Sequence, residues 1–167
     1  MKRLLLVCLM VTLCVLPNVD GNIGSTLGMS QSAYGSNGTY ASDKSGVTWK
    51  YKGWIITEYY DSEGHCDEIV YVRSDDAPLS ESTVLSLLRI NTPIGVVWKE
   101  QQTGSGAFIG ARKWHSTEYM KNELISDSLV AGTYPIPPNP VQGPVITLRY
   151  LLYIKSTSSR HFDWLPE

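Results

Sequence analysis

The chain has 167 residues, 43% of them hydrophobic, with 14 Lys and Arg against 16 Asp and Glu and a formal net charge of −2. This length suits one folded domain. The basic residues are scattered, and Arg112-Lys113 is the only adjacent basic pair after residue 3. The pattern excludes the basic stripe through which proteins contact nucleic acid phosphates, so no nucleic acid partner is expected.

Residues 1–21 predict a secretory signal peptide. Lys2 and Arg3 precede an apolar run from Leu4 to Leu16, and a short polar segment ends at Gly21. A helix of that length would span about 20 Å, against about 30 Å of bilayer hydrocarbon. We expect cleavage near Gly21, a secreted or periplasmic location, and no stable membrane insertion after cleavage. An uncleaved anchor and a buried core helix are the alternatives.

Cysteine usage indicates the same compartment. Cys8 and Cys14 lie in the leader, and neither follows the small residue that a bacterial lipid-attachment site requires. Cys66 then stands alone, so no disulfide can form within the mature chain. An exported domain without disulfides is more typical of a bacterial envelope than of eukaryotic secretion.

Residues 22–46 form a Gly- and Ser-rich segment that predicts one short helix. Ser25 or Thr26 can cap this helix, and Gly35 can end it after Tyr34.

Residues 47–154 predict an α+β domain. The segments 47–51, 54–60 and 68–73 are dense in aromatic and β-branched residues and predict an antiparallel meander. A helix capped by Ser80 follows, with Val84, Leu85 and Leu88 on one face. We expect an antiparallel sheet with one or two helices packed on one face.

The later elements are less regular. Residues 95–100, 107–114 and 145–154 predict strands, whereas 117–130 are ambiguous between strand and short helix. Five prolines between Tyr134 and Pro144 predict a stiff extended connector. Residues 155–167 form a C-terminal tail.

The tryptophans on the predicted strands are the candidate binding residues. Most of them should lie in the core, because aromatic side chains bury large areas. Any that remain exposed would offer a face for a protein or glycan partner. The candidate residues are Trp49, Trp54, Trp98 and Trp114.

No catalytic, cofactor or metal motif is present. His65, His115 and His161 lack zinc-site spacing, and no Gly-x-Ser-x-Gly elbow occurs. The acidic residues near His65 lack the complete alternation of a calcium loop and predict a solvated hairpin tip. Cys66 is expected to be a half-buried strand residue, with an intermolecular disulfide as the alternative. The sequence therefore favours a protein that is not an enzyme and has no cofactor.

One set of positions resembles a group of small exported bacterial proteins of unknown function. It comprises Ile23-Gly24-Ser25-Thr26, Ser30, Tyr34-Gly35, Trp54-Ile55-Ile56, Ile69, Tyr71, Leu79-Ser80, Leu87-Leu88, Asn91 and Trp98. The order of helix, aromatic strands and helix is also similar to the β-lactamase-inhibitor-protein fold and to the small lipoprotein of the barrel-assembly machinery. The resemblance implies an architecture more than a function.

These observations predict an exported, non-catalytic binding or structural domain that contacts another envelope or secreted protein. The alternative is a secreted hydrolase of cell-wall or glycan material. In that case Asp61 and Glu63, with Glu118 or Glu123, would supply the acid and base.

Overall fold

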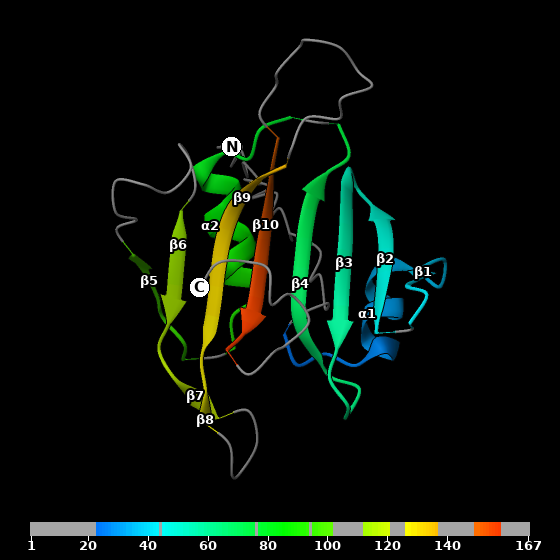
Figure 1. Ribbon diagram of the computed structural model, residues 1–167, viewed down its shortest axis with the longest axis horizontal. Coiled ribbons are helices and arrows are strands. Elements are labelled where there is room, and N and C mark those ends of the chain that lie inside the picture. The colour runs from blue at the N-terminus through cyan, green and yellow to red at the C-terminus, as the bar shows by residue number, and fades with distance from the viewer. Residues whose placement is uncertain are drawn as a thin grey trace, which may run out of the picture.

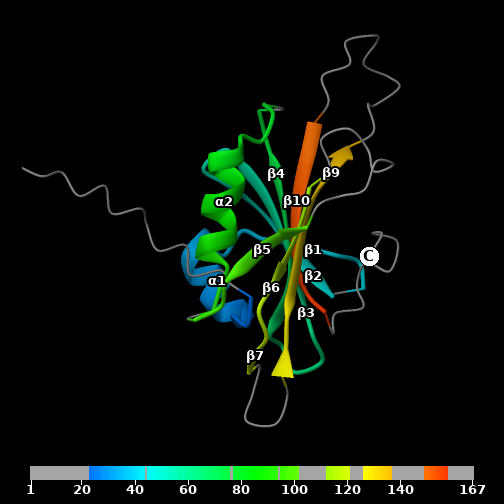
Figure 2. The same ribbon diagram turned by 90° about the vertical axis from the view of Figure 1, so that its left-hand side faces the viewer.

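The computed structural model of the chain describes residues 23–43, 45–75, 77–93, 95–101, 112–120, 126–136 and 149–157. These residues form an α+β fold, as predicted, with an antiparallel sheet of eight strands (Figure 1). Two helices lie on the same face of this sheet (Figure 2). The predicted leader, the first part (107–111) of the strand expected over 107–114, the prolines after Ile136 and the tail after Thr157 lie outside the described residues.

The elements follow one another along the chain as α1 (Leu27–Tyr34), β1 (Thr39–Tyr40), β2 (Gly46–Tyr51), β3 (Trp54–Tyr60), β4 (Cys66–Arg73), α2 (Glu81–Ile90), β5 (Trp98–Gln101), β6 (Lys113–Ser116), β7 (Tyr119–Met120), β8 (Ser126–Asp127), β9 (Leu129–Ile136) and β10 (Arg149–Ser156).

The described sheet has the strand order β1-β2-β3-β4-β10-β9-β6-β5. The meander predicted from the sequence is β2-β3-β4. Lys52 and Gly53 join its first two strands with φ values of 47° and 83°, which are typical of a type I′ hairpin turn. Strand β10 comes late in the chain and pairs with β4 on one side and with β9 on the other. It therefore joins the first four strands of the sheet to the later ones. Strand β5 forms one edge of the described sheet, and the two-residue β1 forms the other.

The core lies between this sheet and the two helices. Trp49, Ile56, Tyr71 and Leu152 lie opposite one another on successive strands, and each is at most 2% exposed. Because opposite residues of antiparallel strands point to the same face, these side chains form one continuous apolar row.

Helix α1 is short and is fixed to the sheet at its C-terminal end. Gly35 ends the helix with a φ of 98°, a conformation that glycine adopts without strain. The Trp49 indole Nε1 donates to the Gly35 carbonyl at 3.0 Å, and the Tyr34 ring centre lies 5.3 Å from that of Trp49. The predicted helix, cap region and terminator are therefore present, with Thr26 as the N-cap.

Helix α2 begins and ends at residues that satisfy its free backbone groups. Ser80 Oγ accepts from the backbone N–H of Thr83 at 3.2 Å. At the other end Asn91 is fully buried, and its Nδ2 donates to the Leu87 carbonyl at 2.8 Å and to the Tyr71 hydroxyl at 3.0 Å. This buried pair fixes the end of α2 against strand β4.

Two sequence predictions need correction, and one alternative that the sequence left open is decided in favour of strand. Leu85 is 48% exposed rather than buried with Val84 and Leu88, because Leu87 takes its place on the face that packs against the sheet. The predicted proline connector begins inside strand β9, where Pro135 lies opposite Tyr150. The ambiguous region from 117 to 130 contributes the short ribbon β7–β8 and the start of β9.

A glycine–tyrosine pair lies on the sheet face opposite the helices. Tyr153 of β10 lies directly across from Gly132 of β9. A Cβ atom at position 132 would come within 2.6 Å of the Tyr153 hydroxyl oxygen. Glycine at this position therefore allows the tyrosine ring to lie flat across the neighbouring strand.

Candidate functional site

The four candidate tryptophans share the helix-covered face of the sheet. Trp49 and Trp114 are 2% and 3% exposed and lie in the core. Trp54 and Trp98 are half-buried and pack against the same core. The four side chains therefore do not make up one exposed surface. Of the four, Trp98 lines a groove.

The groove has a volume of about 310 Å³ and lies between α2 and the start of β5. We call it the α2–β5 groove. Its lining among the described residues is Leu85, Leu88, Arg89, Thr92, Pro93, Val96 and Trp98. The lining is mainly apolar, with one cationic side chain at Arg89. Apolar concave surfaces of this kind are the usual form of a binding site.

Hydrogen bonds hold the floor of the groove. The Trp98 indole Nε1 donates to Thr92 Oγ1 at 2.5 Å, and the Thr92 hydroxyl donates to the Leu88 carbonyl. The indole therefore connects strand β5 to the last turn of α2. Asn91 joins the same turn to β4, so hydrogen bonds connect the end of α2 to both β4 and β5.

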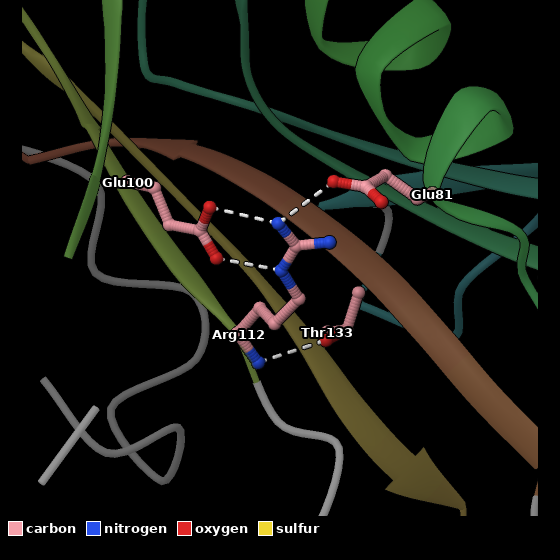
Figure 3. A network of polar contacts seen from close by, with 4 residues as sticks. All are labelled: Glu81, Glu100, Arg112 and Thr133. Carbon is pink, nitrogen blue, oxygen red and sulfur yellow. Dashed lines mark hydrogen bonds and ion pairs between the residues drawn. The ribbon is translucent and has the colours of Figure 1, made fainter. Parts of the chain in front are cut away.

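A charged network joins the N-terminal end of α2 to strand β5 (Figure 3). Arg112 Nε and Nη2 donate to the two carboxylate oxygens of Glu100 on β5 at 2.6 and 2.7 Å, and Nη2 also lies 3.1 Å from Glu81 of α2. The backbone N–H of Arg112 donates to Thr133 Oγ1 at 3.0 Å. The guanidinium lowers the pKa of Glu100 through this hydrogen bonding. The network joins α2, β5 and β9.

The β3–β4 turn brings three potential metal ligands together. Ligand atoms of Asp61, Glu63 and His65 lie within 4.8 Å of one another. Asp61 Oδ1 already accepts from the backbone N–H groups of Glu63 and His65, at 3.0 and 2.9 Å. The turn itself therefore explains why these side chains are close. The predicted solvated tip is only partly correct, because Asp67 and Glu68 are buried in β4.

The proposed acid–base carboxylates are not all at one place. Asp61 and Glu63 follow β3, whereas Glu118 follows β6, which lies three strands beyond β4 in the sheet. Glu123 lies outside the described residues.

Glu58 is a fully buried carboxyl group in the described core. It points from β3 to the helix side of the sheet and has no exposed surface. The Tyr60 hydroxyl donates to its Oε2 at 2.7 Å. Burial raises the pKa of Glu58, and hydrogen bonding from Ser30, Tyr60 and Tyr34 only partly opposes the rise. A substrate could not reach this enclosed carboxyl group in the conformation described, so it is a structural acid.

Cys66 is likewise enclosed. Its side chain is 1% exposed, more buried than predicted, and its thiol donates to the Glu68 carbonyl at 3.4 Å. Burial raises the pKa of the thiol, which keeps it protonated and weakly nucleophilic. These observations fit a packing role.

Comparisons of the chain with protein families, with curated proteins and with solved structures find no match. Among the described helices, none has the length and hydrophobicity needed to cross a membrane.

Of the four tryptophans that the sequence offers as a binding face, Trp98 lines the groove, and the sequence does not point to the rest of the lining. The sequence places Leu85 on the buried face of its helix and Val96 within a strand, so it predicts neither as groove lining. Val84, Leu87 and Leu88 already supply the apolar positions that α2 needs on its buried face. Leu85 is a further apolar residue beside them, and this excess was the signal in the sequence for an apolar surface outside the core.

Proposed function

We propose that this chain is an exported, non-catalytic binding domain that contacts another envelope or secreted protein through the α2–β5 groove. The observation that carries the proposal is the groove, an apolar hollow with the exposed Leu85 on its wall. Concave, mainly apolar surfaces with a few polar groups are the usual form of a binding site.

The two groups in the described core whose chemistry could serve catalysis are both enclosed, which supports a binding role over a catalytic one. The carboxyl of Glu58, whose pKa is raised, and the thiol of Cys66 are both enclosed in the core.

The leader pattern of residues 1–21 supports export, and the N-terminal sequence of the secreted protein should begin near Asn22. A mature protein that still begins at Met1 would contradict the export proposal.

The test is affinity capture from envelope extract and culture medium, followed by quantitative mass spectrometry. The wild-type chain should enrich a protein that Leu85→Lys loses at least about tenfold. Met29→Lys is the matched control, because Met29 is also on a helix and is 51% exposed, but it lies on α1. Equal enrichment by wild type and Leu85→Lys, or turnover of cell-wall glycans by the purified chain, would count against the proposal.

A further inference from the structure

Strand β5 borders the groove and has one unpaired side among the described residues. It pairs with β6 on one side and forms the edge of the described sheet on the other. Edge strands offer a row of backbone donors and acceptors to another chain. Short length protects the opposite edge, where β1 has two residues, whereas β5 has four.

The register fixes which backbone groups of β5 point outward. The Thr117 N–H donates to the Val97 carbonyl at 2.9 Å, so Val97 directs its backbone groups toward β6. In an antiparallel pair the inward and outward directions alternate along the strand. The N–H and C=O groups of Trp98 and Glu100 therefore point away from β6, where an added strand would lie.

The same register places the side chains of an added strand. A residue opposite Trp98 would point to the helix side of the sheet and enter the α2–β5 groove. The next residue along would lie beside Lys99 on the other face. Lys99 is exposed and forms no ion pair with the described residues, so it is available to an acidic side chain on that face.

We propose that β5 and the α2–β5 groove bind an extended segment of another protein by strand addition, and that this segment alternates apolar with acidic residues. The apolar side chains fill the groove over Trp98 on the helix side of the sheet, and the acidic side chains meet Lys99 on the other face. Backbone pairing gives affinity in such complexes, and pockets for alternate side chains give specificity. This inference rests on the proposed function and specifies its partner.

The probe is a phage-displayed library of eight-residue peptides selected on the wild-type full chain. The selected peptides should alternate apolar with Asp or Glu, and synthetic copies should bind in a titration followed by fluorescence anisotropy. Methylating the amide nitrogens that face β5 should abolish binding, whereas methylating the alternate nitrogens should have little effect, since those point away from β5.

Two variants test the side-chain contacts. Leu85→Lys should weaken binding at least about tenfold, and Met29→Lys should leave it unchanged. Lys99→Glu should weaken the acidic peptides roughly tenfold and restore affinity for copies in which the acidic residues are changed to Lys. Circular dichroism should give the same melting profile for the three variants as for the wild type, because all three positions are exposed.

The outcomes separate this inference from the proposed function. Peptides without the alternation, or binding that is insensitive to backbone methylation, would overturn strand addition even if a protein partner is captured at the groove. A second copy of the chain pairing through β5, seen as a dimer that Lys99→Glu disrupts, would also overturn it. If neither a peptide nor a protein partner depends on Leu85, both proposals fail.

Discussion

Helices α1 and α2 lie on the same face of the sheet, but they enclose different chemistry. Beneath α1 the structure buries polar groups, with Ser30 and Glu58 fully enclosed and Tyr34 beside them. Beneath α2 the contacts are mainly apolar, and the outer wall of the helix leaves a groove open to solvent. The α1 region is completed within the chain, whereas the α2 region presents apolar surface that a partner can complete.

The largest expected effect is in the α1 region. Trp49→Ala removes a side chain that is 2% exposed and its hydrogen bond to Gly35. We expect a loss of about 3–5 kcal/mol in the free energy of unfolding. Leu85→Ala in the α2 region should cost about 1 kcal/mol or less, because that side chain is half exposed. Urea denaturation of both variants measures the two losses of unfolding free energy. Equal losses would contradict the proposed difference between the α1 and α2 regions.

The next effect tests whether the groove depends on the buried end of α2. Asn91→Ala leaves the Tyr71 hydroxyl and the Leu87 carbonyl without their partner. We expect a loss of about 1–3 kcal/mol in unfolding free energy, together with weaker binding of groove peptides. Ser86→Ala, at an exposed position of the same helix, should stay within about 0.5 kcal/mol of wild type. Unchanged peptide affinity in Asn91→Ala would show that the groove does not need this anchor.

The third effect is a pH dependence that belongs to the α1 region. The pKa of Glu58 is raised above its ordinary value of 4.5 in the folded chain, chiefly by burial. The stability from its protonated form is therefore fully present below about pH 4.5 and is lost as the pH rises through the folded-state pKa. Glu58→Gln should remove this part of the pH dependence in urea denaturation curves.

A companion variant checks the cause of that pH dependence. In the wild type the Tyr60 hydroxyl donates to the Glu58 carboxyl and lowers its pKa, and Tyr60→Phe removes this hydroxyl. The pKa of Glu58 should therefore rise further in the variant. The pH range over which stability is lost should then extend upward. If Glu58→Gln and the wild type keep parallel stability curves, the buried carboxyl does not titrate as described.

The smallest effect concerns the exposed charges that join α2 to β5. Glu81→Gln removes one contact of Arg112 and leaves its two hydrogen bonds to Glu100. We expect a cost of about 1 kcal/mol or less, because exposed ion pairs contribute little. Thermal unfolding at low and high salt should show the difference shrinking as salt screens the charges. A large, salt-independent loss would mean that the network holds α2 in place.

The elements of the fold were predictable because their signals are local. Aromatic and β-branched runs predicted β2, β3 and β4, and Ser80 predicted the start of α2. The placement of β10 beside β4 was not predictable in this way, since it depends on contacts between residues more than 70 positions apart, such as Leu152 and Tyr71.

The candidate site was predictable only in part, because burial depends on packing between distant elements. Trp98 was selected from its strand, but the exposure of Leu85 depends on how α2 crosses the sheet. The burial of Glu58 also depends on a distant element. Its place two residues from Ile56 puts it on the core face, and α1 supplies the Ser30 hydroxyl that accompanies it.

Under the proposed function, the position of Trp98 limits how the binding preference can diverge between related proteins. Its indole packs against the core and also lines the groove, so a substitution there would change stability and recognition together. Leu85 and Arg89 are exposed positions of α2 and carry no such double constraint. Variation in ligand choice should therefore accumulate at these two positions while the tryptophan is retained, much as antibody frameworks persist beneath variable loops.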